Sequence, residues 1–312
     1  MAEATNYSEM RRDFYAKYQK NIVPVVKNFD KERKIKLFFA IVGATILSII
    51  GCICLLGLLV ADGDKDVIEA SLKGALFFFG LACGVWYMIK KGFESKIKAK
   101  IMPTVCSCFE NLIWSEGVYE GGELFKASGV VPHFTSESYD DIFTGSHKDV
   151  NMEIVESDFV VGHGKNRRTV FSGVVIKLDM NKNFTSHTVI TPDTLFHKSP
   201  VKDLRHTTLE DVQFEKKFDV FTNDEVDARY LITPTFMERL KGMKTAFKAD
   251  KIRCSFYGQY LLVALSTNKD LFSLCSLVKP MDDAQQYFQM YEEMVSIVKL
   301  IDHFKLDQKI GL

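Results

Sequence analysis

The stretch LFFAIVGATILSIIGCICLLGLLV, residues 37–60, decides the architecture of this chain because its 24 residues carry no charge. A second uncharged stretch, GALFFFGLACGVWYMI, covers residues 74–89. A bilayer core about 30 Å thick requires roughly 20 helical residues. The first stretch is long enough to span it, and the stems of flanking lysines such as Lys90 extend the second by snorkelling. The two stretches therefore predict a transmembrane hairpin.

The charges beside the two predicted spans indicate their orientation. Residues 1–36 hold nine Lys/Arg against five Asp/Glu, and residues 90–100 hold five Lys against one Glu, so each flank carries a net +4. The loop 61–73 carries −2. Lys and Arg concentrate on the cytoplasmic flanks of membrane spans. We therefore predict that both termini are cytoplasmic and that the loop is external.

The remaining residues, 101–312, are mildly acidic, because the whole chain sums to zero and this part must carry −6. General binders of nucleic acids or of membrane surfaces are usually basic, so the charge argues against both classes, and no nucleic-acid partner is predicted. None of the seven cysteines forms a C-x-x-C pair, which argues against a zinc ribbon or a thioredoxin-type site. Thiols without such a pattern are typical of a reducing compartment.

Helical periodicity continues from both spans into the flanking residues, with apolar side chains every three or four positions. Pro24 and Pro103 each lie about 20 Å from the membrane along their helices. Either the two prolines mark an antiparallel stalk that is kinked or interrupted at one level, or their shared level is a coincidence. The predicted segments are a cytoplasmic juxtamembrane helix 1–36, a first transmembrane helix 37–60, a short external loop 61–73, a second transmembrane helix 74–91, a cytoplasmic stalk helix 92–116 and a soluble cytoplasmic domain 117–312.

The soluble domain alternates strand and helix signals. Period-two runs predict two hairpins, 151–161 with 168–180 and 252–256 with 260–266, and three further strands at 186–191, 218–221 and 228–232. Thr233 and Pro234 predict a helix start, and a last helix is expected over 282–305. Residues 193–212 are polar and predict a long loop. This order indicates an α+β class with a mainly antiparallel sheet packed with helices.

The apolar stripe of the last helix leaves two interpretations open. A seam with steps of three and four residues suits a coiled coil and hence a homo-oligomer. Additional apolar positions widen the stripe and favour packing against the sheet. The seam residues are Ala284, Tyr287, Tyr291, Met294, Val298 and Ile301, and the additional ones are Phe288, Val295 and Phe304.

Several of these segments resemble a bacterial membrane-protein family catalogued as domain of unknown function 3137, over roughly residues 90–305. The most specific stretch is Asp227-Ala228-Arg229-Tyr230-Leu231-Ile232-Thr233-Pro234 followed by Phe236-Met237-Glu238-Arg239-Leu240. Matching pieces before and after it are Ser138-Tyr139-Asp140-Asp141 leading to Gly145, Phe171-Ser172-Gly173, Phe218-Asp219-Val220-Phe221, Ser255-Phe256, Leu262-Val263-Ala264 and Asp270-Leu271-Phe272. The resemblance implies an anchored cytoplasmic domain of unassigned activity in the bacterial inner membrane, and it implies no catalytic residue.

Two basic features are candidate binding sites. The turn at 162–167 lacks the third glycine and the following helix of a phosphate loop, so Lys165, Arg167 and Arg168 form either a solvated turn or a contact with anionic lipid or an acidic partner. Asp227 and Arg229 lie two residues apart on a predicted strand and share a face. They form either a structural pair or a site in which Arg229 binds a carboxylate or phosphate.

The sequence predicts no catalytic residue, no metal site and no cofactor. The seven histidines never fall at metal-ligand spacing, and no G-x-S-x-G, H-E-x-x-H or P-loop pattern occurs. We therefore predict a membrane-anchored binding or scaffold domain that contacts a protein or lipid partner. The alternatives are an enzyme acting on a membrane-borne substrate and an accessory subunit of a transporter.

Overall fold

A computed structural model describes residues 2–61, 63–109, 111–148, 150–180, 183–193, 197–209, 211–267, 271–272, 276–278, 281 and 284–309, with side chains described between residues 7 and 302. The chain divides into two compact units. The sheet unit comprises Met1–Met10, Val105–Phe272 and Tyr287–Leu312. The helical unit comprises Arg11–Thr104 and Ser273–Gln286.

The first helical run is continuous from α1 (Ala2–Lys17) through a π-helical turn η1 (Tyr18–Ile22) into α2 (Val23–Val60). Pro24 stands at the start of α2. Proline has no N–H and its ring clashes with the carbonyl four residues earlier, so the ladder widens to a π-turn there. An interruption of the α-helix is therefore found beside Pro24, in the form of a π-helix, whereas α3 continues through Pro103 to Cys106.

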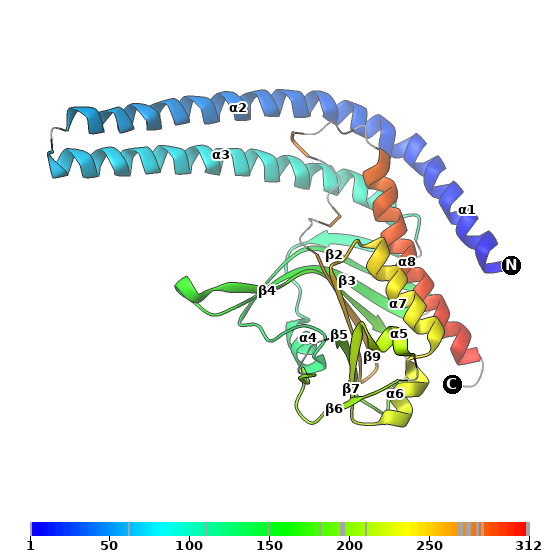
Figure 1. Ribbon diagram of the computed structural model, residues 1–312. Coiled ribbons are helices and arrows are strands. Elements are labelled where there is room, and N and C mark those ends of the chain that lie inside the picture. Colours follow the sequence, from blue (N-terminus) through cyan, green and yellow to red (C-terminus); the bar gives the residue numbers. More distant parts are fainter. Residues whose placement is uncertain are drawn as a thin grey trace. The chain divides into compact units, whose positions relative to one another are not determined.

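The second long helix, α3 (Lys65–Cys106), runs antiparallel to α2 (Figure 1). The two helices approach closely: a Cβ added at Gly57 would lie 2.5 Å from Ser71 Oγ. Outside the apolar stretches, Lys96 Nζ lies 2.8 Å from Glu32 Oε1. The predicted stalk segments thus pair within one chain.

Both long helices are apolar and long enough to cross a membrane. Only 11% of the most apolar window of each is buried in the structure, unlike a helix at the core of a soluble protein. Small residues such as Gly57 permit the close approach that helices in lipid use. The pair therefore indicates membrane association.

The end of α3 differs from the predicted stalk helix 92–116. The helix ends at Cys106, three residues after Pro103, and Ile113–Glu116 form the strand β1 instead. This segment is a strand because it pairs with the next one: Ile113 and Trp114 lie in register with Thr144 and Phe143. A short segment cannot reveal such a partner by its own periodicity.

The sheet unit is built on nine strands in the order β1-β2-β3-β4-β9-β8-β5-β7-β6, with every described pair antiparallel. The two predicted hairpins are confirmed as β3–β4 and β8–β9. Residues 193–212, predicted as a loop, include the short edge strand β6. The remaining strands are β2 (Ser136–His147), β3 (Val150–Val161), β4 (Arg168–Asp179), β5 (Thr188–Pro192), β6 (Arg205–Thr207), β7 (Phe218–Thr222), β8 (Lys251–Tyr257) and β9 (Tyr260–Ser266).

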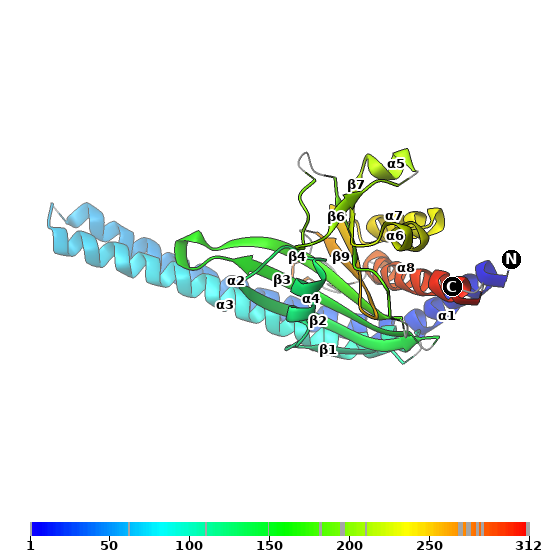
Figure 2. The same ribbon diagram turned by 90° about the horizontal axis from the view of Figure 1, so that it is seen from below.

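Helices cover both faces of this sheet, as Figures 1 and 2 show. On one face, Phe236 of α7 (Pro234–Ala246) packs on Phe256 of β8, with ring centroids 5.4 Å apart. On the other face, Ser255 Oγ donates to the carbonyl oxygen of Ser128 in α4 (Gly122–Ser128), at 2.7 Å. Neighbouring residues of β8 thus point to opposite layers, as strand geometry requires. The other helices are α5 (Val212–Glu215), α6 (Glu225–Leu231) and α8 (Ala284–Lys309).

Local capping signals read from the sequence are confirmed in α7. Thr233 is the N-cap and accepts a hydrogen bond from Phe236 N at 3.2 Å, while Pro234 occupies the first turn. Along α8, the stripe residues Tyr287, Tyr291, Met294, Val295, Val298 and Ile301 are buried, and Ala284 and Phe288 are half-buried. This burial favours packing of the helix within its own unit over a coiled-coil seam, and a homo-oligomer stays a prediction. Asp282, expected to open α8, and Phe304, part of its stripe, lie outside the described side chains.

Candidate functional site

The predicted basic turn forms the tip of the β3–β4 hairpin, which extends beyond its neighbouring strands (Figures 1 and 2). A short 3₁₀ segment, η2 (Gly164–Asn166), makes the turn. Lys165, Arg167 and Arg168 are all exposed, and none of them forms an ion pair with a described residue. The tip therefore presents three uncompensated positive charges.

The predicted strand at Ala228–Ile232 is wrong, and so is the pairing of Asp227 with Arg229. These residues lie in α6, whose start is capped by Asp224, which accepts hydrogen bonds from Val226 N and Asp227 N. Positions two apart on a helix do not face each other. Asp227 instead accepts a hydrogen bond from Ser186 N at 3.1 Å.

Arg229 lies on the exposed side of α6, with its side chain 53% exposed. Its nearest described acidic partner is Glu225, one turn earlier, at 3.9 Å. An exposed pair at this distance holds the guanidinium weakly. Binding of a ligand by Arg229 therefore stays a prediction, without the strand geometry that motivated it.

A basic pocket, which the sequence did not reveal, lies beside α7 at the start of β7 and β8. Its volume is about 580 Å³. Five lysines line it against two aspartates, so the lining carries a net +3. None of these lysines forms an ion pair with a described residue. The lining residues that carry charge are Lys216, Lys217, Lys241, Lys244, Lys251, Asp193 and Asp250.

Three elements converge to build the basic pocket. Asp193 N donates to the Lys217 carbonyl oxygen at 2.9 Å, which holds the end of β5 against the start of β7. Lys241 and Lys244 stand on α7 and are half-buried, so their methylene stems pack while their ammonium groups reach water. The five ammonium groups around this one pocket repel one another, which favours binding of an anion.

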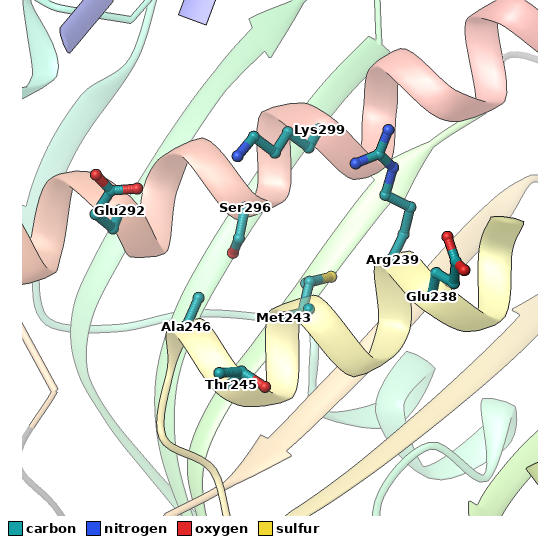
Figure 3. A pocket seen from close by; sticks show the side chains of 9 residues that line it. Glu238, Arg239, Met243, Thr245, Ala246, Glu292, Ser296 and Lys299 are labelled. Carbon is teal, nitrogen blue, oxygen red and sulfur yellow. The ribbon is translucent and has the colours of Figure 1, made fainter. Parts of the chain in front are cut away.

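A second pocket, of about 560 Å³, lies on the other side of α7, between α7 and α8 (Figure 3). The Arg239 Nε atom is buried there and has no hydrogen-bond partner among the described residues. Lys299 of α8 also lines the pocket and lies over the Tyr7 ring, 5.1 Å from its centroid. Glu238 and Glu292 balance these two cations, so this pocket has no net charge to select an anion.

A histidine cluster forms on the opposite face of the sheet from α7. His197 Nδ1 lies 2.5 Å from Asp219 Oδ1, and His206 Nε2 lies 3.4 Å from the same oxygen. One ligand atom from each residue lies within 4.8 Å of the others. No sequence motif points to this group, because eight residues separate His197 from His206 and twelve separate His206 from Asp219, so the three meet only through the fold.

A second buried carboxylate, Asp302 of α8, has a different set of partners. Tyr7 Oη donates to it at 2.6 Å, and His147 Nε2 and Lys148 Nζ lie at 2.8 and 2.6 Å. Burial acts to raise the pKa of Asp302, but the hydrogen bonds from His147, Lys148 and Tyr7 outweigh it and hold the pKa well below its usual range. This carboxylate ties α1 and the β2–β3 turn to α8.

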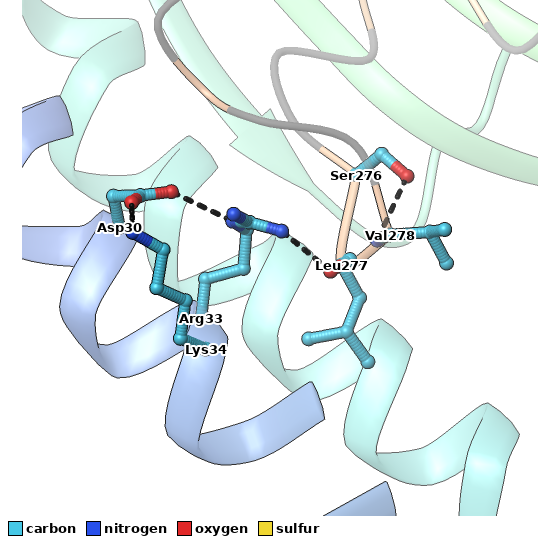
Figure 4. A network of polar contacts seen from close by, with 6 residues as sticks. All are labelled: Asp30, Arg33, Lys34, Ser276, Leu277 and Val278. Atoms are coloured by element: carbon cyan, nitrogen blue, oxygen red, sulfur yellow. Dashed lines mark hydrogen bonds and ion pairs between the residues drawn. The ribbon is translucent and has the colours of Figure 1, made fainter. Parts of the chain in front are cut away.

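A polar network in the helical unit holds the segment before α8 against α2 (Figure 4). Arg33 is only 6% exposed, and it donates to Asp30 Oδ1 at 2.8 Å and to the Leu277 carbonyl oxygen at 3.2 Å. Lys34 also pairs with Asp30, at 2.9 Å. The hydrogen bonds from Lys34 and Arg33 lower the pKa of Asp30. These contacts give Arg33 a structural role.

Two long apolar helices and an antiparallel sheet with helices on both faces define a membrane-associated α+β protein. A family model described as "Protein of unknown function (DUF3137)" matches residues 169–306, which confirms the resemblance read from the sequence. The match includes the basic pocket and the histidine cluster, whereas the hairpin tip and the Ser138–Gly145 stretch precede it.

No curated protein matches this chain. Among solved structures, the crystal structure of the mycobacterial trehalose monomycolate transport factor A, TtfA, is similar at 11% identity, with a TM-score of 0.29. The similarity covers 54% of this chain and 75% of that one. A likeness this weak supports no statement about fold or function.

Proposed function

We propose that this chain is an anchored binding protein of the bacterial inner membrane whose cytoplasmic α+β domain captures a phosphorylated anion in the basic pocket. The observation that carries the proposal is the set of five lysines around one pocket, none paired with a described acidic group. Ammonium groups bind phosphate as compact point charges, whereas planar carboxylates are matched better by arginine. The pocket volume falls in the range typical of small-ligand sites.

The proposal is tested with inorganic tripolyphosphate and the full-length chain in nanodiscs of neutral lipid. Isothermal titration calorimetry should show binding that weakens as salt rises, because screening shortens the reach of the lysines. Replacing Lys217 and Lys251 with serine should weaken binding at least about tenfold, since charge-assisted hydrogen bonds contribute roughly 1.5–3 kcal/mol each.

The matched control replaces Lys31 and Lys202, two exposed lysines that do not line the pocket. This variant has the same net charge as the test variant and should bind like the wild type. Equal weakening in both variants would show diffuse attraction and contradict a defined site. The same titration in nanodiscs of phosphatidylglycerol distinguishes a lipid headgroup from a soluble ligand. Weaker tripolyphosphate binding there would indicate that the headgroup competes for the pocket, and unchanged tripolyphosphate binding would indicate a soluble ligand.

The hairpin tip supports a second candidate function, contact with anionic lipid. Its three exposed cations have no described ion-pair partner, and each charge near an anionic surface contributes about 1 kcal/mol. Full-length chain in neutral nanodiscs should bind added phosphatidylglycerol vesicles, and binding should disappear at 1 M salt. Serine at positions 165, 167 and 168 should abolish binding while the melting temperature stays unchanged. Unchanged vesicle binding would reject this contact.

The orientation rests on the +4, −2, +4 charge pattern, and a labelling experiment tests it. Lys65 and Lys202 are both exposed. A cysteine placed at position 65 should react with an impermeant reagent in intact cells, and one at position 202 should react only after lysis. Labelling of position 202 from outside would reverse the orientation. The enzymatic and transporter-subunit alternatives stay predictions.

A further inference from the structure

The histidine cluster brings two nitrogen donors and one carboxylate to one point on the sheet. Asp219 is 2% exposed, whereas the His197 and His206 side chains are 51% and 34% exposed. The two imidazole rings lie close together, with centroids 4.6 Å apart and planes inclined at 36°. The cluster therefore has a buried anchor and an open, water-facing side.

Strand geometry explains why His206 and Asp219 meet. His206 of β6 lies in register with Phe221 of β7, and Asp219 stands two residues before Phe221 on the same face. His206 is thus a diagonal cross-strand neighbour of Asp219, a spacing that long side chains bridge. The His206 ring also packs edge-on against Phe221, with centroids 5.6 Å apart, which fixes its direction.

His197 reaches the same point from the loop before β6. Its backbone φ is +40°, in the left-handed region that residues other than glycine seldom adopt. Strain of this kind is found mainly where surrounding contacts require it, and it clusters at functional sites. In this protein, the left-handed backbone of His197 occurs together with the placement of its Nδ1 atom beside Asp219 Oδ1.

A further histidine on this face has another partner. His187 Nε2 donates to the Ser128 carbonyl oxygen at 3.0 Å, and its ring packs on Tyr257. Burial lowers the pKa of His187, against the effect of that hydrogen bond. The donor set on the described residues is therefore His197, His206 and Asp219.

We propose that His197, His206 and Asp219 bind one Zn²⁺ ion, with a water molecule as the fourth ligand. Zinc accepts imidazole nitrogen and carboxylate oxygen at about 2.0–2.2 Å in tetrahedral geometry, which places ligand atoms about 3.3 Å apart. The separations from Asp219 Oδ1, 2.5 and 3.4 Å, bracket that value. Binding requires His197 Nδ1 to move away from Asp219 Oδ1 by rotation of its exposed side chain, and the exposed side of the histidines leaves the fourth position open to solvent.

The bound ion joins the edge of the sheet to its interior. β6 is a three-residue edge strand, and the loop before it carries Val201, whose side chain lies against Gly129 at the end of α4. Coordination through His197 and His206 fixes both the loop and the edge strand to the buried Asp219. Zinc should therefore raise the melting temperature of the wild-type chain, since a ligand that binds only the folded state stabilises it.

The experiment uses full-length protein in neutral nanodiscs, with its affinity tag removed and metal stripped by a chelator. Calorimetric titration with ZnCl₂ should show one ion per chain. His206→Gln and, separately, His197→Gln should each weaken binding by at least about tenfold, because even changes to groups behind a metal ligand cost 10–100-fold. His163→Gln, at an exposed histidine of the hairpin turn, should bind like the wild type.

Several outcomes would overturn the site. They are absence of zinc binding by the wild type, equal affinity in His206→Gln and His163→Gln, and a zinc-induced rise in melting temperature that survives both ligand substitutions. Melting of each metal-free variant separates loss of a ligand from loss of the fold. Because His197 is half-exposed in a loop, its substitution tests the site even if His206→Gln destabilises the edge strand.

Discussion

Phe218 and Asp219 are neighbours on β7, yet they belong to two different sites. Phe218 lines the basic pocket on the face covered by α7, whereas Asp219 lies in the histidine cluster on the opposite face. The pocket gathers lysines that have no described ion-pair partner, on flexible and partly exposed stems. The cluster holds a buried carboxylate within 3.4 Å of two imidazoles.

The difference shows that charge sign and spacing decide what each site can bind. Like charges around an open hollow repel and are relieved by an anion. Nitrogen and oxygen donors within 4.8 Å of one another are suited to a cation. Because successive residues of a strand face opposite sides, a change at one site need not affect the other.

The largest effect is expected for Asp219→Asn. The amide keeps the shape of the side chain but removes the negative charge that anchors the proposed ion, so zinc affinity should fall by about 100-fold, the upper end for changes around a metal. Tripolyphosphate binding on the other face should not change. Calorimetry with both probes on the same preparation checks this. A parallel loss of both affinities would show that the two sites are coupled or that the fold is damaged.

A smaller effect is expected for Asp302→Asn, the buried carboxylate whose partners come from the chain itself. Its pKa is lowered by hydrogen bonds that outweigh burial, so its contribution to stability is present above the unfolded-state pKa and is lost as pH falls through the folded-state pKa. At pH 7 the variant should be about 2 kcal/mol less stable than the wild type. Denaturation at pH 7 and pH 3 should show the difference shrinking in acid. A difference that is constant with pH would contradict the assignment.

The smallest effect is expected for Arg229→Gln, which removes the exposed partner of Glu225. An ion pair of this kind contributes at most about 0.5 kcal/mol, so the melting temperature should be nearly unchanged. Asp227→Asn should cost more, because Asp227 accepts a hydrogen bond from Ser186 N. The double variant should show additive losses, since the two side chains do not face each other. A large coupling energy between the two substitutions would instead support the Asp227–Arg229 pair that the sequence predicted.

The error at residues 228–232 shows what local patterns miss. Tyr, Leu and Ile suit a strand, but Asp224 caps the first turn of a helix and β7 has already ended at Thr222. The same limit applies to 113–116, where pairing with β2 makes a strand of a segment predicted as helix. By contrast, the β3–β4 and β8–β9 hairpins were predicted, because alternation and turn residues lie within a few positions of each other.

The sequence by itself determined the two apolar helices, the hairpins, the capped start of α7 and the exposed cationic turn. Each depends on interactions between residues close along the chain, which composition and periodicity report directly. Only the tertiary structure brought together the residues of the two sites, one on each face of β7. The lysines of the basic pocket span residues 216–251 and the histidine cluster spans 197–219, and only strand pairing and the packing of α7 bring their side chains together. Neither set leaves a local pattern, because proximity across a sheet depends on register and not on distance along the chain.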